Sequence, residues 1–310
     1  MNKKFLVCIV GPTAIGKTAL SLRLAQHFQT EILSGDSRQF YKEMRIGTAV
    51  PSEEELQVAK HHFIQNRSIR EDYSVGAFEQ DAIALLQELF RTRDVLLMVG
   101  GSGLYVDAVC RGLDEFPEVD PDIRKGLQMD LKRKGITFLQ EKLKALDPDS
   151  YRQLDMQNKQ RLIRALEVCL GSGRPYSSFL SNPKKKRDFS VIKIGLTAER
   201  EVIYGRINAR VDQMMAQGLL EEVKALYPFR ERNALQTVGY RELFEFLDGK
   251  RSLQEAVEEV KKNTRRFAKR QATWYRKDPE IRWFDHNEDQ EGIIRFLENT
   301  MRSTNSPSGS

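Results

Sequence analysis

Two segments of the chain are apolar at nearly every position, residues 5–10 and residues 95–99. Strands whose two faces are both covered by helices show this pattern, because neither side of the strand meets water. A third, shorter strand is predicted at residues 31–33, and amphipathic helices are predicted from residue 17 onward and over residues 76–91. Strands that alternate with helices indicate the α/β fold class, with a parallel sheet flanked by helices.

The pattern changes over residues 120–189, where helical periodicity continues without a strand. Asp120-Pro121 and Asp147-Pro148 are typical helix starts, because Asp caps the first turn and Pro fits its first position. We therefore expect an inserted all-helical lobe over residues 120–189. Glycine, proline and basic residues near its end, at 171–175 and 184–187, are typical of a hinge loop.

The core is predicted to consist of residues 1–119 and residues 190–302, on either side of the lobe. The second part begins with an apolar strand at residues 191–196. After it the pattern predicts helices at residues 199–216, 219–227, 240–247 and 253–275, a short strand near Arg282 and a final helix. Residues 303–310 are small and polar, and we expect a disordered tail there.

The composition excludes several classes of protein. The chain has 310 residues, of which 40% are hydrophobic and 30% charged, as is usual for a globular protein. No apolar run approaches the ~20 residues that a membrane-spanning helix needs, and the first run ends without a secretory cleavage site. Cys8, Cys110 and Cys169 fit neither a disulfide framework nor a zinc spacing. We therefore expect a cytoplasmic monomer without membrane contact.

The charge is unevenly distributed. The formal net charge is +6, but residues 261–282 alone carry nine basic and two acidic side chains. Such a stripe attracts polyanions such as nucleic acid, although a solvated helix face has the same composition. The adjacent His61 and His62 have no third ligand nearby in the sequence, so we expect no metal site there.

One motif carries a specific chemistry. The segment Gly11-Pro12-Thr13-Ala14-Ile15-Gly16-Lys17-Thr18 matches the phosphate-loop pattern G-x-x-x-x-G-K-[ST], between a predicted strand and a helix. The glycines let the backbone wrap phosphates, and the helix N-terminus donates N–H groups to them. Lys17 neutralises charge and Thr18 can hold Mg²⁺. A chance glycine-rich turn explains less, so the sequence predicts a diphosphate or triphosphate ligand.

The motifs that accompany this phosphate loop are unusual for a nucleotide hydrolase. The strand at residues 95–99 runs into Gly100-Gly101-Ser102-Gly103 without the carboxylate that commonly orients magnesium. These glycines indicate either a close approach to a ligand or a tight turn. Asp36 follows the second strand, at the sheet edge where ligands of α/β folds bind. From its position alone, Asp36 is a catalytic base or the cap of a turn.

Further motifs follow in order along the chain: Asp36-Ser-Arg-Gln-Phe-Tyr41, Ile46-Gly-Thr-Ala49, Gly100-Gly-Ser-Gly-Leu-Tyr105, residues 155–167, Arg206-x-x-x-Arg210-x-x-x-Met214, Gly218-Leu-x-x-Glu-Val223, Val238-Gly-Tyr-Arg241 and Ala268-Lys-Arg-Gln-x-Thr-Trp274. Together with the phosphate loop, they resemble the bacterial type of the tRNA dimethylallyltransferase, or tRNA isopentenyltransferase, family. The resemblance covers residues 5–285 and implies a P-loop NTPase-like fold.

The resemblance implies transfer of a dimethylallyl group from dimethylallyl diphosphate to N6 of the adenosine 3′-adjacent to the tRNA anticodon, position 37, with release of pyrophosphate. No γ-phosphoryl group is transferred, which agrees with the missing carboxylate after residue 99. Mg²⁺ on Thr18 is the implied cofactor, and the anticodon stem-loop is the implied partner.

The resemblance also assigns residues to roles. The catalytic residues would be Asp36 as base, with Thr13, Lys17 and Arg210. The diphosphate would contact Gly11, Pro12, Thr13, Ala14, Ile15, Gly16, Lys17, Thr18, Arg206 and Arg210. The tRNA would contact Asp36, Ser37, Arg38, Gln39, Ser102, Arg124, Gln160, Arg161, Leu162, Ile163, Arg164, Gln236, Thr237, Val238, Gly239, Tyr240 and Arg241. Within the lobe, helical spacing turns Leu162 and Ile163 inward and Gln160 and Arg164 outward. The helix around Lys269 and Arg270 would also bind RNA.

Some positions depart from the family pattern. Ile15 stands where Ser is usual, and Ser102 where Thr is usual, but neither change removes a required group. No zinc-finger extension follows Asp285, which argues against the eukaryotic form. Trp274 and Trp283 are interpreted as packing residues. Two other functions stay open, a P-loop kinase of a nucleoside or small metabolite and a non-catalytic RNA-binding ATPase module.

Overall fold

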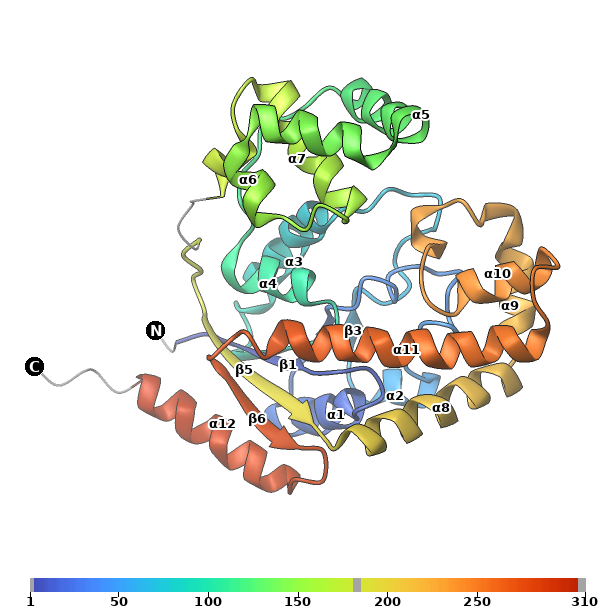
Figure 1. Ribbon diagram of the computed structural model, residues 1–310. Helices are drawn as coiled ribbons and strands as arrows, with labels where there is room; N and C mark the ends of the chain where they lie inside the picture. The colour runs from blue at the N-terminus through green and yellow to red at the C-terminus, as the bar shows by residue number, and fades with distance from the viewer. Residues whose placement is uncertain (1–2, 181–184, 306–310) are drawn as a thin grey trace, which may run out of the picture. The chain divides into compact units, whose positions relative to one another are not determined.

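The computed structural model describes residues 3–180 and 185–305 (Figure 1). The chain forms two compact units. One comprises the chain up to Arg111 and from Arg187 onward, and we call it the α/β unit. The other comprises Gly112–Lys186, and we call it the helical lobe. Among the described residues, no helix is long and apolar enough to cross a membrane.

The α/β unit is built on one parallel sheet of six strands in the order β3-β2-β4-β1-β5-β6. The strands are β1 Phe5–Val10, β2 Ile32–Ser34, β3 His61–His62, β4 Val95–Val99, β5 Ser190–Thr197 and β6 Ile281–Asp285. The predicted α/β class is therefore confirmed. The two-residue edge strand β3 was not predicted, because it is too short to show an apolar pattern.

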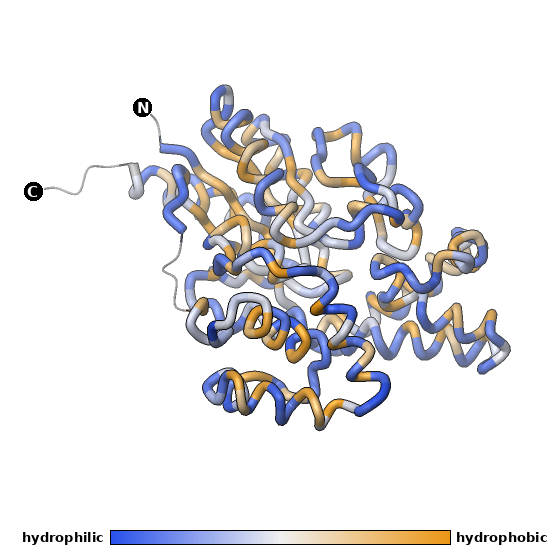
Figure 2. Tube along the Cα trace, turned by 90° about the horizontal axis from the view of Figure 1, so that it is seen from above, coloured by the Kyte–Doolittle hydropathy of each residue, from blue (hydrophilic) through white to orange (hydrophobic). Residues whose placement is uncertain are grey.

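Helices cover both faces of this sheet. The helices of the α/β unit are α1 Lys17–Phe28, α2 Glu53–Val58, α3 Val75–Leu89, α4 Gly103–Arg111, α8 Arg200–Ala216, α9 Leu219–Leu226, α10 Tyr240–Leu247, α11 Leu253–Tyr275 and α12 Gln290–Asn305, with short 3₁₀ turns at Tyr227–Phe229 and Asn233–Leu235. Figure 2 shows hydrophobic and hydrophilic residues mixed along the helical turns, as expected when one face of a helix packs inward.

The central strand β1 explains why its sequence is apolar throughout. Leu6, Cys8 and Val10 pack into a core that includes side chains of α3, α4, α9, α10 and α11. Phe5 and its alternate neighbours pack into a second core, formed largely with α1 and α12. Because successive side chains of a strand point to opposite faces, a strand between two cores needs apolar residues at every position.

The helical lobe contains α5 Pro121–Leu146, α6 Pro148–Gln153, α7 Lys159–Ser172 and the 3₁₀ turn Tyr176–Phe179. Both expected helix starts are confirmed: the side chains of Asp120 and Asp147 accept hydrogen bonds from the backbone N–H groups of Asp122 and Ser150. Helix α5 breaks at Gly135, whose φ of 79° is left-handed. The lobe has its own apolar core along α5 and α7.

The boundaries differ from those expected. The compact lobe is Gly112–Lys186 rather than residues 120–189. Ser303 to Asn305 belong to α12, so the prediction of disorder is wrong for them; residues 306–310 lie outside the described residues. In the basic run at 184–187, Lys184 also lies outside them, whereas Arg187 is held by Glu79 and by the carbonyl groups of Ala108 and Val109.

Candidate active site

The phosphate loop joins β1 to α1, as the motif requires. Gly11 has a φ of 140°, and a Cβ atom there would lie 2.6 Å from the carbonyl oxygen of Leu196. Gly16 caps α1 with a φ of 110°. Both positions therefore favour glycine because of their positive φ, and Gly11 also for steric reasons. The result is a turn whose backbone leads into a helix N-terminus, the arrangement that binds phosphate oxygens.

Lys17 folds back over the loop. Its Nζ donates hydrogen bonds to the carbonyl oxygens of Gly11, at 3.0 Å, and Pro12, at 2.8 Å. Burial lowers the pKa of Lys17 to about 8, while the charge of Asp36 opposes this shift and that of Arg210 adds to it. The ammonium group is thus costly to keep charged without an anion beside it, and an arriving diphosphate would relieve that cost.

Two arginines of α8 reach the same loop, where the family resemblance assigned them. Arg206 Nη1 donates to the carbonyl oxygen of Ile15 at 3.1 Å, and Arg210 Nη1 approaches Thr13 Oγ1 at 3.4 Å. Asp212, the nearest carboxylate after Arg210 in the sequence, pairs with Lys261 at 2.8 Å. Among the residues that the structure describes, no carboxylate pairs with Lys17, Arg206 or Arg210.

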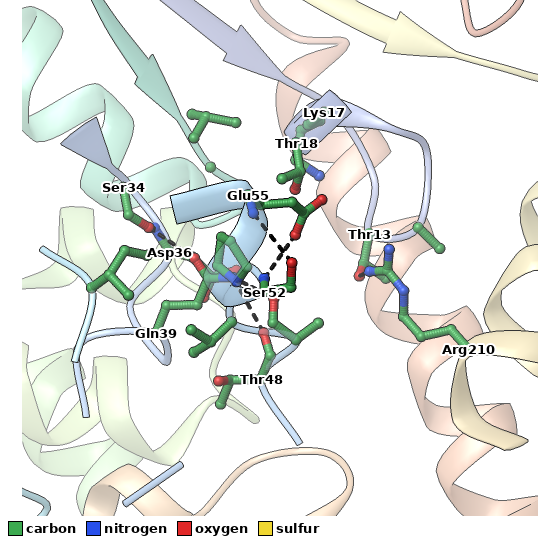
Figure 3. Close-up of a pocket in the computed structure, with 18 of the residues that line it drawn as sticks. Thr13, Lys17, Thr18, Ser34, Asp36, Gln39, Thr48, Ser52, Glu55 and Arg210 are labelled. Carbon is green, nitrogen blue, oxygen red and sulfur yellow. Dashed lines mark hydrogen bonds between the residues drawn. The ribbon is translucent and has the colours of Figure 1, made fainter. Parts of the chain in front are cut away.

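Asp36 lies just beyond β2, on the opposite side of the pocket from Arg210 in the view of Figure 3. The backbone N–H of Arg38 donates to Asp36 Oδ1 at 3.0 Å, so the turn-cap interpretation is correct. Burial raises the pKa of Asp36, while the Arg38 N–H and the charge of Lys17 oppose this shift. A carboxylate of raised pKa accepts a proton more readily, so the cap and the base are compatible roles.

Two pockets meet at Asp36. The first, of about 560 Å³, is lined by the phosphate loop, Thr18 and the segment after Ile46. The second, of about 390 Å³, is lined by Ser102, Val238, Trp274 and their neighbours. Seven residues line both: Thr13, Asp36, Thr48, Ala49, Gly101, Arg210 and Met214. The predicted base, hydroxyl and arginine therefore stand where a group in one pocket can react with a group in the other.

Gln271 of α11 joins the two glycine-rich loops, a role the sequence did not reveal. Its Oε1 accepts from the backbone N–H of Thr13 at 2.9 Å, and its Nε2 donates to the carbonyl oxygen of Gly101 at 3.0 Å. A Cβ atom on Gly101 would lie 2.1 Å from Nε2, and one on Gly100 would lie 2.5 Å from the backbone of Gly35. These glycines allow close packing within the protein.

The residues expected at the tRNA around Asp36 are held by hydrogen bonds within the protein. Ser37 and Ser102 hydrogen-bond through their hydroxyl groups at 3.1 Å. Arg38 Nη1 donates to the carbonyl oxygens of Asn233 and Ala234. Gln39 Nε2 donates to those of Thr48 and Ala49. These bonds position the turn after Asp36 and leave its surface facing the second pocket.

The segment 236–241 divides into two groups. Thr237, Val238 and Gly239 line the second pocket, and Gln236 and Arg241 are exposed. Tyr240 is fully buried, and its hydroxyl donates to Glu222 at 2.6 Å. Its side chain is therefore a core residue here, and the prediction that it contacts tRNA is not supported by its position.

The lobe places its candidates in one cluster. Arg124 Nη1 and Arg164 Nη1 both donate to Glu167 Oε2, at 3.1 and 3.2 Å, and Arg124 Nη2 donates to Gln160 Oε1 at 3.3 Å. Arg161 is exposed on the same helix. Glu167 is buried and had no predicted role, although its spacing from Arg164 places it on the same helix face.

Leu162 and Ile163 are buried in the lobe core. The inward direction expected from helical spacing is confirmed. Leu162 is 0% and Ile163 2% exposed, so their side chains are core residues here, and the contact of this segment with tRNA stays a prediction.

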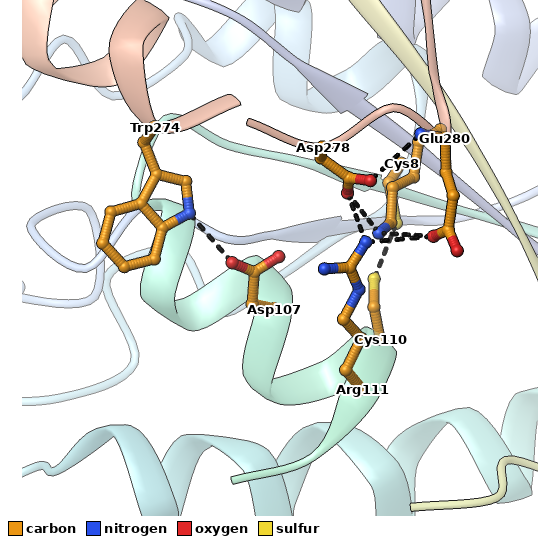
Figure 4. Close-up of polar contacts among 8 residues, drawn as sticks. Cys8, Asp107, Cys110, Arg111, Trp274, Asp278 and Glu280 are labelled. Atoms are coloured by element: carbon orange, nitrogen blue, oxygen red, sulfur yellow. Dashed lines mark hydrogen bonds and ion pairs between the residues drawn. The ribbon is translucent and has the colours of Figure 1, made fainter. Parts of the chain in front are cut away.

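The basic helix α11 and the two tryptophans were also assigned roles from the sequence. Lys269 and Arg270 of α11 are exposed, and Arg270 lines the second pocket. Trp274 lines it too and is 37% exposed; its Nε1 donates to Asp107 at 2.8 Å (Figure 4). Trp274 is thus a wall of the pocket as well as a packing residue. Trp283 packs against Gly195, as interpreted from the sequence.

The remaining cysteines and histidines have local partners. Cys8 and Cys110 are free thiols with their Sγ atoms 3.4 Å apart (Figure 4). His62 hydrogen-bonds with Glu31, and His61 with the carbonyl group of Ala59. In the described ranges, no three His, Cys, Asp or Glu residues converge as metal ligands.

Comparison with known proteins identifies the family. The model of the IPP transferase family matches residues 39–278. A tRNA dimethylallyltransferase of Christiangramia forsetii is 58% identical over 96% of this chain and 99% of its own length. The crystal structure of the tRNA isopentenylpyrophosphate transferase of Bacillus halodurans has 38% identity and a TM-score of 0.73, covering 97% of this chain and 98% of that one.

A third comparison concerns a complex with RNA. A structure of a eukaryotic dimethylallyltransferase acting on tRNA has 26% identity and a TM-score of 0.78, and covers 99% of this chain and 81% of that one. The family predicted from the motifs is confirmed, and so is the P-loop-like fold. The chain belongs to the IPP transferase family and is a prenyltransferase that transfers a dimethylallyl group to tRNA.

Proposed function

We propose that the chain transfers the dimethylallyl group of dimethylallyl diphosphate to N6 of the adenosine 3′-adjacent to the anticodon, and that it does so as a cytoplasmic monomer. The observation that carries this proposal is the position of Asp36 and Arg210 where two pockets meet. One pocket contains the cations that suit a diphosphate. The other, with Trp274 and Arg270 on its wall, suits a purine taken out of its stack.

The leaving group is pyrophosphate, so negative charge grows on it as the allylic C–O bond breaks. The phosphate loop, Lys17 and Arg210 line the pocket around that position, and Arg206 supports the loop through the carbonyl oxygen of Ile15. Because no carboxylate among the described residues neutralises these cations, their charge is available to the diphosphate. Thr13, held between Gln271 and Arg210, directs its hydroxyl toward the same pocket.

Magnesium fits the first pocket as a cofactor. Mg²⁺ prefers oxygen ligands and commonly keeps several waters while it binds substrate phosphates. Thr18 would hold it through its hydroxyl, with Glu55 lining the same pocket to bind its waters. Bound there, Mg²⁺ would add positive charge against the diphosphate. The absence of three converging ligands in the described ranges agrees with a metal held mostly by substrate and water.

Asp36 would take the proton that N6 loses. The exocyclic amine of adenine is a weak nucleophile because its lone pair is delocalised into the ring, so removal of its proton assists bond formation. Burial raises the pKa of Asp36, which brings it nearer to the working pH of a base. The Arg38 N–H fixes one carboxylate oxygen and so orients the other.

The tRNA would be held by sites in both units. In the α/β unit these are the walls of the second pocket and the exposed face of α11 with Lys269 and Arg270. In the lobe they are Arg161 and the cluster of Arg124, Gln160 and Arg164. Contacts of this kind release counterions, so the affinity for tRNA should fall steeply with salt.

The direct test uses purified protein, Mg²⁺, radiolabelled dimethylallyl diphosphate and an unmodified tRNA that reads codons beginning with U. We expect label in the RNA, mapped to the adenosine beside the anticodon. A matched tRNA with guanosine at that position is the control and should remain unlabelled.

Label on another nucleotide, or no label on any tRNA, would contradict the proposal. If ATP were turned over instead, with indifference to RNA, the chain would act as a P-loop kinase.

A further inference from the structure

Three sequence motifs that the mechanism leaves without a role meet at one carboxylate. They are Ile46-Gly-Thr-Ala49, Gly218-Leu-x-x-Glu-Val223 and Val238-Gly-Tyr-Arg241. The carboxylate belongs to Glu222 of α9. Its Oε2 accepts from the backbone N–H groups of Arg45, at 2.9 Å, and Ile46, at 2.8 Å. Its Oε1 accepts from the N–H of Gly47 at 3.0 Å and from the hydroxyl of Tyr240 at 2.6 Å.

Three of the four hydrogen bonds of Glu222 hold the loop at residues 45–47. Three successive backbone N–H groups form an anion-binding concavity, and here the anion is a side chain of the same protein. A carboxylate accepts about four hydrogen bonds, and Glu222 has all four. Hydrogen bonds to an ionised acceptor are stronger than neutral ones, so the backbone of residues 45–47 is tightly held.

Tyr240 supports this arrangement from the core. It is fully buried, and burial together with the charge of Glu222 raises the pKa of its hydroxyl. The hydroxyl therefore stays protonated and donates a hydrogen bond to Glu222. A Cβ atom on Gly47 would lie 2.6 Å from the Tyr240 oxygen, so the loop lies directly on the ring and only glycine fits there.

The loop held in this way forms part of the wall where the two pockets meet. Thr48 and Ala49 line both pockets, Ile46 lines the first and Gly47 the second. On its other flank, Gln39 Nε2 donates to the carbonyl oxygens of Thr48 and Ala49 (Figure 3). Residues 45–49 are therefore fixed from both sides at the place where the transferred carbon must pass.

We propose that Glu222, supported by Tyr240, is a positioning residue that sets the size of the passage for the transferred prenyl group. This inference rests on the proposed function. Thr48 and Ala49 have small side chains and line both pockets together with Arg210 and Met214. The space left among these four residues determines how long a chain fits beside Asp36. A rigid wall orients a five-carbon group and excludes longer ones by steric contact.

The test compares three variants with the wild type. Glu222→Gln keeps the shape and replaces one acceptor oxygen by an NH₂ group, which opposes the loop N–H groups. Tyr240→Phe removes one of the four hydrogen bonds. Glu221→Gln is the matched control, because Glu221 is exposed and its nearest cation is Lys224 at 3.6 Å. The measurements are kcat and KM for dimethylallyl diphosphate, and the inhibition constant of geranyl diphosphate, a ten-carbon analogue.

We expect Glu222→Gln to raise the KM for dimethylallyl diphosphate. The ratio of the inhibition constant of geranyl diphosphate to that KM should fall about tenfold, as for loss of a charged hydrogen bond. Tyr240→Phe should shift the same ratio by about threefold, because three hydrogen bonds remain. The KM for tRNA, and every constant of Glu221→Gln, should match the wild type.

An unchanged preference between the five-carbon and ten-carbon diphosphates in folded Glu222→Gln would overturn the proposal. A loss of activity in proportion to the loss of folded protein, with the KM for dimethylallyl diphosphate and the inhibition constant of geranyl diphosphate unchanged, would also overturn it. If Glu222→Gln does not fold, an unchanged ratio in Tyr240→Phe overturns it equally. Failure of the proposed function itself is a separate result, because the wild type would then transfer no prenyl group.

Discussion

The phosphate-loop pocket and the arginine cluster of the lobe both gather cations, but they partner them differently. Around the loop, Lys17 and Arg210 contact carbonyl and hydroxyl oxygens, and no carboxylate of the described residues pairs with them. In the lobe, Arg124 and Arg164 share the buried carboxylate of Glu167. The first site has free positive charge beside a cavity. The second has its charge largely neutralised before any ligand arrives.

This difference indicates two ways of binding an anion. Uncompensated cations in a pocket favour a diphosphate and stabilise charge that develops during reaction. Compensated cations on a scaffold are held in a defined geometry, and they recognise a surface by position more than by net charge. We therefore expect the pocket to control the chemical step, and the lobe cluster to control the affinity for tRNA.

The largest effect should come from Asp36→Asn. Asparagine keeps the oxygen that caps the turn at Arg38 but cannot take a proton from N6. Transfer in a single turnover should fall about 10³-fold, while diphosphate binding measured by calorimetry stays close to the wild type.

Retained transfer would leave Asp36 with the cap role alone. Loss of diphosphate binding would move Asp36 into the magnesium site. The matched lobe variant, Gln160→Ala, should leave the single-turnover rate with saturating tRNA unchanged.

The second effect separates the two arginines of α8. Arg210 lines both pockets, whereas Arg206 is exposed and touches only the outer side of the loop at Ile15. Arg210→Ala should lower kcat about 10²-fold, and Arg206→Ala should lower it about tenfold at most. Equal losses would show that the distinction between them is wrong. Arg124→Ala of the lobe should leave kcat near the wild-type value.

The pH dependence gives a third test. Asp36 must be deprotonated, and its pKa is raised by burial, so kcat/KM should fall as the pH drops below that pKa. Lys17 must be protonated, and its pKa is about 8 in the free protein, so kcat/KM should fall about tenfold per unit above pH 8. Lys17→Arg keeps the charge and should remove the alkaline limb. An alkaline limb that persists in this variant would assign it to another group.

The smallest effect belongs to the lobe. Glu167→Gln leaves Arg124 and Arg164 without their common counter-charge, and the cluster should lose its geometry. The KM for tRNA should rise about threefold, and the free energy of unfolding should drop by about 1 kcal/mol, because both arginines are partly exposed to water. A change in the KM for dimethylallyl diphosphate would contradict the separation of the two sites. Lys125→Gln, an exposed neighbour paired with Asp122, is the control.

Local features of the sequence predicted much of the fold. The apolar runs of β1 and β4 indicated buried parallel strands, and the Asp-Pro pairs indicated helix starts in the lobe. The ends of α10 and α11 agree with the predicted ranges. The lobe boundaries and the edge strand β3 could not be predicted in the same way, because they depend on which segments pack together, and no local periodicity reports that.

In the candidate site, too, some residues could be predicted from local sequence and others could not. Lys17 and Thr18 stand within one contiguous motif, and Asp36 follows a strand, so both were accessible to sequence reasoning. Gln271 was not, because its partner Thr13 lies 258 residues away. Tyr240 was assigned to the tRNA surface from the family resemblance, and only the packing shows that its ring is buried beneath Gly47.

The sequence by itself determined the class of fold, the phosphate loop and the family, because each depends on residues that are close together or in a fixed order. Only the tertiary structure decided that Asp36 stands between two pockets, that Arg206 and Arg210 face the loop and not Asp212, and that Glu222 holds the loop at residues 45–47. The physical reason is that hydrogen bonds and burial depend on distance in space. Gly47 and Glu222 are 175 residues apart in the chain, yet their atoms lie 3.0 Å from each other.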